Sequence, residues 1–374
     1  MNFYNILDTK KKLLFIFLTF VVIGFFTQTI FKGLDNSCDL MWQPTKLFWS
    51  GINHYEYQYT TRDWFLGCQK GQYGHFLFVF LYPISFLDWE QAKIFWIITN
   101  IFFAISIPLM ICRSSNLSLI LTLLVLGIFL TSHPTRMTFN LGQNSLMMFF
   151  FLSLPFIFSE KYKNTKSLLS GISYVKYSTG YVLFLNFLVE KKFKKLFLSS
   201  FFTILSWLFY SYYVNESLID SFIWPFKLII SDNYTRTSDV YSILNLYFLK
   251  DVSIQNKIIQ ILLVLILNIF FLNQIKNIKD NLGKLCVVCV LPLISLPHSN
   301  YDYVLLLPML IYGLKNINHN ISKYCIFFVI YFFYFNRLIR HWISNDIFYQ
   351  SLILIILTIL LTFFTKHIKK NNNS

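Results

Sequence analysis

The feature that most constrains this chain is a series of apolar stretches that recurs along the whole sequence. The first runs from Leu13 to Phe31 and follows three consecutive lysines. About 20 apolar residues are what an α-helix needs to cross a bilayer. Charged residues make up only 13% of the 374 residues, against about 25% in ordinary soluble domains. The sequence therefore predicts an all-α polytopic membrane protein.

Apolar length predicts about ten transmembrane crossings. They fall at residues 13–31, 92–111, 117–132, 145–158, 196–214, 258–273, 285–296, 303–314, 324–338 and 347–365. Two polar connections are long. Residues 32–91 are expected to form a first exterior loop with short interfacial helices, and residues 215–256 a second exterior loop. Residues 1–374 together are expected to be a single integral membrane domain.

The stretch from Leu168 to Val189 is an exception, because lysines flank both of its ends. Lysine and arginine mark the cytoplasmic side of a membrane protein, so both ends are predicted to be cytoplasmic. About 22 residues cannot cross twice as full helices. We predict a re-entrant pair of half-helices with its tip near residues 177–180. Such backbone is tolerated only where it is buried in protein or lines a cavity.

The charge is lopsided, with 32 Lys and Arg against 17 Asp and Glu. The lysine clusters at 161–166, 191–195, 276–284 and 366–370 fall on one predicted side, which places both termini in the cytoplasm. The acidic residues gather on the exterior side, so polar chemistry is expected there. No basic stripe with interleaved aromatics lies on a polar helix, which argues against nucleic-acid binding.

The six cysteines are scattered along the chain. Cys286 and Cys289 form a CxxC inside an apolar run, which we interpret as two small core residues rather than a redox or metal site. Cys38 and Cys68 fall in the same predicted exterior loop. They could pair in an oxidising compartment.

Asp39 is the first candidate for chemistry. It follows the first apolar stretch by a few residues and lies near Trp42, a residue type that favours headgroup depth. A carboxylate held there can take a proton from the hydroxyl of a lipid-linked substrate. The alternative is a solvated loop carboxylate. Asp35 has a weaker claim, because it lies nearer the helix end.

The polar segment from His133 to Asn144 separates two apolar stretches and is expected to form a compact exterior turn. Gln143 and Asn144 offer paired donors and acceptors suited to sugar hydroxyls. Arg136 could clamp a phosphate. The alternative for all three is capping and turn chemistry for the next helix.

Lys176 lies near the predicted re-entrant tip. An ionisable residue at membrane depth indicates function, and a phosphate would be its natural partner. The alternative is a lysine that snorkels to the interface. Snorkelling is also expected for a basic group at the exterior end of the crossing at 324–338, namely Arg337, Arg340 and His341.

His298, Tyr301 and Asp302 belong to the densest polar string between two apolar stretches. His298 and Asp302 are spaced i, i+4, so they could share one helical face. Metal-ligand spacing of this kind is weak by itself, and no metal site is predicted. The three side chains are expected to line a wet cavity and to bind substrate.

These clusters, in this order, resemble glycosyltransferase family 87, which belongs to the polytopic GT-C class and includes bacterial polyprenyl-phosphate-mannose-dependent mannosyltransferases. Tyr177 departs from the family pattern, in which proline often follows the lysine. The matching elements are the Asp after the first span, Phe80-Leu81-Tyr82-Pro83, Gly142-Gln143-Asn144, Gly171 followed by Lys176, and the string from His298 to Leu307.

The resemblance implies a GT-C-like fold and an inverting membrane glycosyltransferase. It would move a hexose, with mannose favoured, from a polyprenyl-phosphate carrier to an exoplasmic lipid or glycan acceptor, in the plasma membrane of a bacterium. Asp39 would be the general base, and Lys176 or Arg136 would stabilise the leaving phosphate. The lipid-linked donor and the surrounding membrane lipids are the expected partners, and no cofactor is expected.

A transporter or flippase of lipid-linked saccharides is the main alternative. Such proteins more often show paired repeats with broken spans in matching positions of two halves. This sequence shows one broken segment and no counterpart. A non-catalytic membrane scaffold is the third possibility, and it predicts that the exterior polar residues can be replaced without loss.

Overall fold

The computed structural model describes residues 9–38, 40–61, 73–231, 239–247, 254–342 and 346–373. Within these ranges the chain folds into helices joined by turns, and no β-strand occurs. The prediction of an all-α chain is confirmed for this part of the protein. Asp39 and Cys68 lie outside the described residues.

Long apolar helices confirm that the chain is a multi-pass membrane protein. Among the described residues five helices are long and apolar enough to cross a bilayer, and a sixth candidate is a helix pair bent by 50°. The five are α1 (Thr9–Asn36), α6 (Trp89–Ser114), α12 (Phe193–Tyr213), α15 (Ile254–Ile275) and α20 (Asp346–Asn373). The bent pair is α7 (Leu119–Thr131) with α8 (His133–Leu141).

The other predicted crossings fall on shorter elements, so the count of ten remains a prediction. A helix of 13 residues is about 20 Å long, which is less than the hydrocarbon core of about 30 Å. These elements are α9 (Ser145–Ile157), α16 (Asn281–Ser295), the 3₁₀ helix η4 (Asn300–Leu306), α17 (Leu307–Lys315), α18 (Asn320–Ile330), the π-helix η5 (Tyr331–Phe335) and α19 (Asn336–Trp342). The equally short α11 (Tyr177–Val189) belongs to the segment predicted to be re-entrant.

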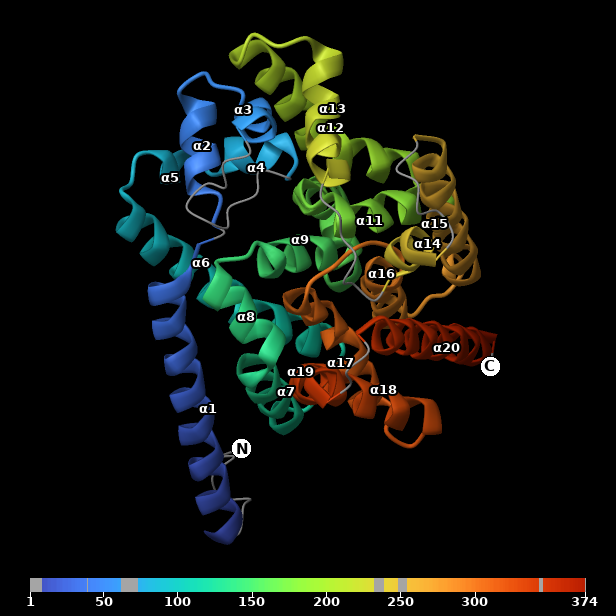
Figure 1. The fold of residues 1–374 in the computed structure, drawn as a ribbon. Coiled ribbons are helices and arrows are strands. Elements are labelled where there is room, and N and C mark those ends of the chain that lie inside the picture. Colours follow the sequence, from blue (N-terminus) through green and yellow to red (C-terminus); the bar gives the residue numbers. More distant parts are fainter. Residues whose placement is uncertain are drawn as a thin grey trace.

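The two predicted exterior loops pack together at one end of the molecule, at the top of Figure 1. Asn53 Nδ2 donates a 2.6 Å hydrogen bond to Glu216 Oε2, and His75 Nε2 lies 2.9 Å from Ser221 O. Two loops on the same side of a membrane are expected to meet in this way. The helices of this layer are α2 (Trp42–Trp49), α3 (His54–Thr61), α4 (His75–Phe80), α5 (Tyr82–Ser85) and α13 (Leu218–Ser231). The second loop also contains α14 (Val240–Tyr247), which lies lower in the figure and packs against α15.

His75 makes the stability of this loop layer dependent on pH. Burial lowers the pKa of His75 to about 4, whereas an unfolded histidine titrates near pH 6.5. Between these values the unfolded chain binds a proton that the folded chain does not, so stability is lost as the pH falls. We expect a loss on the order of 3 kcal/mol between pH 7 and 4, measured by thermal unfolding.

A matched pair of variants isolates this contribution. His75→Gln should flatten the pH dependence below about pH 6.5, whereas His319→Gln, at an exposed histidine in ring contact with His367, should change it far less. Burial also lowers the pKa of the neighbouring His54, so His75→Gln should keep part of the dependence of stability on pH. Equal slopes in wild type and His75→Gln would contradict the prediction.

The segment predicted to be re-entrant folds as a helical hairpin. α10 (Lys163–Ser170) and the 3₁₀ helix η3 (Gly171–Val175) lead to Lys176, and α11 returns. The two ends are brought together by an ion pair of 3.7 Å between Glu160 and Lys195. At the tip, Gly74 N donates a 2.7 Å hydrogen bond to Val175 O, so the tip contacts the first exterior loop. The tip lies at Lys176, just before the predicted 177–180, and its depth in a membrane remains a prediction.

Two glycines allow the hairpin to pack closely. A Cβ on Gly171 would lie 1.8 Å from Ser199 O, and one on Gly180 would lie 2.4 Å from Ser173 O. Because both clashes are with backbone, Gly171→Ala is expected to cost at least about 3 kcal/mol, the upper end of usual overpacking. Gly24→Ala is the control, since a Cβ there meets nothing within 4 Å. Size-exclusion profiles and thermal midpoints should show Gly171→Ala aggregated and Gly24→Ala intact.

The segment from His133 to Asn144 corrects one prediction, because most of it is a helix rather than a turn. Ser132 Oγ accepts a 3.3 Å hydrogen bond from Thr135 N, and Pro134 occupies the first turn of α8, where its missing N–H costs nothing. Gly142, with φ +72°, ends the helix. Only the Gly-Gln-Asn segment forms the turn.

The cysteines agree with the interpretation of Cys286 and Cys289 as core residues. Both are fully buried and free, as are Cys112 and Cys325. Cys38 is disulfide-bonded. Cys68, with which it could pair, lies outside the described residues.

Candidate active site at the hairpin tip

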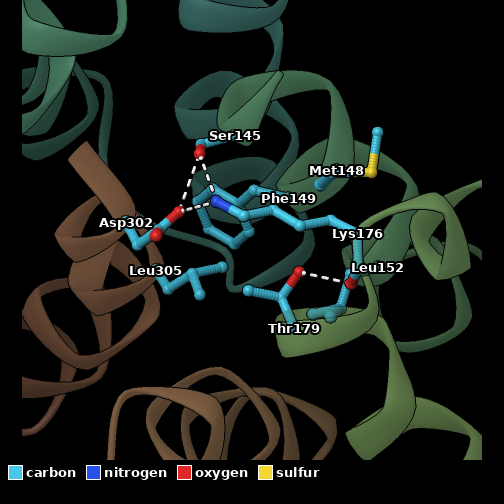
Figure 2. Close-up of a pocket in the computed structure, with 8 residues that line it drawn as sticks. All are labelled: Ser145, Met148, Phe149, Leu152, Lys176, Thr179, Asp302 and Leu305. Atoms are coloured by element: carbon cyan, nitrogen blue, oxygen red, sulfur yellow. Dashed lines mark hydrogen bonds and ion pairs between the residues drawn. The ribbon is translucent and has the colours of Figure 1, made fainter. Parts of the chain in front are cut away.

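Three polar side chains from distant parts of the sequence meet at the hairpin tip (Figure 2). Lys176 Nζ forms an ion pair with Asp302 Oδ1 and donates a 3.1 Å hydrogen bond to Ser145 Oγ. Ser145 Oγ donates a 2.7 Å hydrogen bond to the same Asp302 oxygen. Lys176 is 9% exposed and Asp302 only 2%. The two buried charges therefore compensate each other.

The local backbone explains why these groups are held so firmly. Asp302 Oδ2 accepts a 3.1 Å hydrogen bond from Ser299 N, which caps η4 and fixes the carboxylate at the start of that helix. Lys176 lies at the break between η3 and α11, where its carbonyl accepts a 3.2 Å hydrogen bond from Thr179 Oγ1. Both charged residues are thus anchored at helix starts.

A small pocket surrounds the triad. The gaps between its lining side chains are too narrow for a water molecule. Ser145, Lys176 and Asp302 meet on one side of it, and Thr179 lies apart from them, bonded to the Lys176 carbonyl (Figure 2). A sugar could enter only after these side chains move apart. Its other lining residues are Met148, Phe149, Leu152 and Leu305.

Tyr301 and His298 border the triad. The Tyr301 ring centre lies 4.9 Å from Lys176 Nζ, a cation–π distance. His298 is within electrostatic reach of Lys176 and Asp302, and its Nε2 lies 3.3 Å from Tyr303 OH. His298 does not share a helical face with Asp302, so that prediction was wrong. The reason is that the chain is extended at Leu296 and Ser299, before η4 begins.

Gln143 and Asn144 lie next to Ser145 in the turn that opens α9. Gln143 Oε1 accepts a 3.0 Å hydrogen bond from Tyr73 OH. Asn144 is fully buried, and neither of its side-chain polar atoms has a hydrogen-bond partner among the described residues. A buried amide without partners requires an explanation, and a ligand hydroxyl would supply one.

Asp39 itself lies outside the described residues, but its neighbours are informative. Cys38 N donates a 3.4 Å hydrogen bond to Leu141 O. Leu40 is fully buried, and its Cβ would lie 3.4 Å from a Cβ on Gly142. The residues on either side of position 39 therefore contact the turn that carries Gln143 and Asn144.

Arg136 does not join the triad. It lies within electrostatic reach of His133, which is also near Arg337. The predicted site residues thus divide into the Lys176–Asp302 group and a separate basic group. No three His, Cys, Asp or Glu side chains of the described residues lie close enough to hold a metal ion.

Two residues of the site escaped sequence analysis. Ser145 looks like an ordinary first residue of an apolar helix, and nothing in the sequence marks its bond to Asp302. Asp239 is fully buried and within electrostatic reach of His298. Asp239 Oδ1 accepts a 2.8 Å hydrogen bond from Ser242 N, so its sequence context signals a helix cap and no more.

The fold and the site define a polytopic membrane protein with buried polar groups where the predicted exterior loops meet a helical hairpin. The sequence model of glycosyltransferase family 87 matches residues 72–295, which is more than half of the chain. The chain belongs to glycosyltransferase family 87 and is a membrane glycosyltransferase. The matched range includes Asn144 and Lys176 and ends just before His298. No curated protein and no solved structure matches the chain.

Proposed function

We propose that this glycosyltransferase transfers a hexose, with mannose favoured, from a polyprenyl-phosphate carrier to a lipid or glycan acceptor at the exoplasmic face of the membrane. The observation that carries the proposal is the meeting of buried polar groups with the first exterior loop at the hairpin tip. The unpartnered Asn144 amide and the nearby Gln143 suit sugar hydroxyls. The apolar helices around them suit a lipid-linked donor.

In the proposed reaction, the Asp39 carboxylate takes the proton of the acceptor hydroxyl as its oxygen attacks the anomeric carbon. The bond from that carbon to the carrier phosphate breaks on the opposite side, so the configuration inverts. The carrier leaves as a phosphate monoester anion, which needs no acid but does need positive charge nearby. The contacts of Cys38 and Leu40 with the turn before Asn144 support a place for Asp39 at this site.

The sidedness of the proposal is supported by the predicted cytoplasmic turns. One common pocket is lined by residues from four separate turns, namely 114–115, 156–159, 279–282 and 315. Both termini are proposed to lie on that side. In oriented vesicles, a cysteine introduced at position 192 should react only with an impermeant thiol reagent that is added on the cytoplasmic side. Labelling from the exterior would overturn the topology.

A transporter or flippase of lipid-linked saccharides is the competing function. The two are separated by giving vesicles that contain the purified protein a radiolabelled polyprenyl-phosphate hexose and a membrane lipid extract. A transferase moves the label to a new lipid or glycan product. A flippase leaves the label on its carrier and changes only the leaflet in which the carrier lies. Carrier movement without a new labelled product would reject the proposed function.

A further inference from the structure

Two buried nitrogen atoms on α8 have no hydrogen-bond partner among the described residues. They are His133 Nε2 and Arg136 Nε, which lie three residues apart on one helix. Residues at this spacing are neighbours on a helix surface. A buried polar group left unsatisfied costs about 1–3 kcal/mol. Two such groups side by side suggest that an acceptor binds there.

A second cation, Arg337, completes the group, which we call the basic cluster: His133, Arg136 and Arg337. His133 is within electrostatic reach of both arginines. Arg337 is exposed and comes from α19, which lies far from α8 in the sequence. In the described part of the chain neither arginine forms an ion pair with a carboxylate. The two guanidinium charges are therefore not balanced by a carboxylate in this part of the chain.

The surrounding backbone holds the cluster in place. α7 ends at Thr131, because Pro134 has no N–H with which to continue the helical hydrogen bonds. Near this end, the carbonyl of Ile128 accepts a 2.8 Å hydrogen bond from Tyr334 OH. The same hydroxyl lies 2.7 Å from Thr131 Oγ1. Tyr334 belongs to the π-helix η5, and Arg337 follows it by three residues. π-Helical turns are rare and occur frequently at functional sites.

The electrostatics distinguish this cluster from Lys176. Lys176 is paired with Asp302, so the net charge of that pair is close to zero. The basic cluster has no such compensation. Its helix α8 packs against η4, the helix that carries Asp302, so the cluster and the hairpin tip belong to neighbouring elements. Planar guanidinium groups bind phosphate oxygens in pairs, which suits two arginines to this ligand.

We propose that His133, Arg136 and Arg337 bind the phosphate of the lipid-linked donor, and that Lys176 mainly holds Asp302 and Ser145 in place. This inference rests on the proposed function for the identity of the ligand. The carrier phosphate has one negative charge while it is esterified to the sugar and gains charge as the bond breaks. Uncompensated cations at that point would stabilise the transition state more than the ground state.

Binding of farnesyl phosphate to the purified protein in zwitterionic nanodiscs tests the proposal, with farnesol as the uncharged probe. Arg136→Gln and Arg337→Gln should each weaken farnesyl phosphate binding at least about tenfold, the loss of one charge-assisted contact. Farnesol binding should not change. Arg113→Gln, at the exposed C-terminal turn of α6, is the matched control and should bind like wild type. Thermal midpoints confirm that each variant is folded.

Three results would overturn the proposal. The first is wild-type affinity for farnesyl phosphate in both cluster variants. The second is equal competition by phosphatidylglycerol, which would assign the cluster to bulk anionic lipid. The third is equal competition by inorganic phosphate, which would assign it to a soluble anion.

The binding test is independent of sugar transfer. If the wild type transfers sugar but the cluster variants bind farnesyl phosphate normally, the proposed function stands and this inference fails. If the binding of farnesyl phosphate depends on the basic cluster but no sugar is transferred, the phosphate site stands and the proposed function fails.

Discussion

Asp39→Asn is expected to lower the rate of sugar transfer by about 10²–10⁴-fold, the usual contribution of a general base. The amide has nearly the same shape as the carboxylate but cannot take the proton from the hydroxyl of the sugar acceptor. Donor binding should remain close to that of wild type, because Asp39 is not assigned to the carrier phosphate. The measurement is the initial rate of label transfer from a saturating lipid-linked donor.

Asp35→Asn is the matched control for this variant. Asp35 lies four residues earlier, in the exposed last turn of α1, and carries the same charge. The Asp35→Asn variant should transfer sugar at nearly the wild-type rate. If Asp39→Asn kept more than about half of the wild-type rate, or if both variants lost activity equally, Asp39 would not be the general base.

Lys176→Met is expected to destabilise the protein by about 3–5 kcal/mol, the usual cost of removing one partner of a buried ion pair. The variant leaves Asp302, only 2% exposed, without its cation. Lys192→Met removes a lysine whose side chain is 43% exposed and pairs with Glu190 at 2.7 Å. It should cost less than about 1 kcal/mol. Thermal or denaturant unfolding in detergent measures both.

A double variant separates structure from catalysis at this pair. Lys176→Met with Asp302→Leu removes both charges, so it should recover much of the lost stability. If the recovered protein also recovers sugar transfer, Lys176 acts by positioning its neighbours. A stable double variant without transfer would instead show that Lys176 or Asp302 contacts the substrate. Wild-type stability in Lys176→Met alone would contradict the structural role.

Much of the frame was predictable from the sequence, because membrane helices follow from local apolar length. The crossings at 13–31, 92–111, 196–214, 258–273 and 347–365 each fall on a long helix. The lysines at both ends of 168–189 likewise predicted the hairpin, since charge placement is a local signal. Short elements were harder, because a helix of 13 residues is shorter than a bilayer and its neighbours decide where it ends.

The site was only partly predictable, because its contacts join residues far apart in the chain. Lys176 and Asp302 were each selected as substrate-binding candidates, yet their ion pair spans 126 residues and no local pattern announces it. Arg136 was selected for phosphate, but its neighbour Arg337 looked like a snorkelling residue. The helix at 133–141 was not predicted, because a short polar segment between two apolar stretches looks like a turn; Ser132 and Pro134, which begin the helix, are also common in turns.

The most direct measurement is whether the purified wild-type protein forms a glycosylated product and releases the free carrier in the same reaction. With a radiolabelled polyprenyl-phosphate hexose and a membrane lipid extract, it should form a labelled glycolipid or glycan and release free polyprenyl phosphate in equal amount. A nucleotide-linked hexose should not replace the donor. If the label stays on the carrier, or if only the nucleotide-linked sugar is used, the proposed lipid-linked transfer is contradicted.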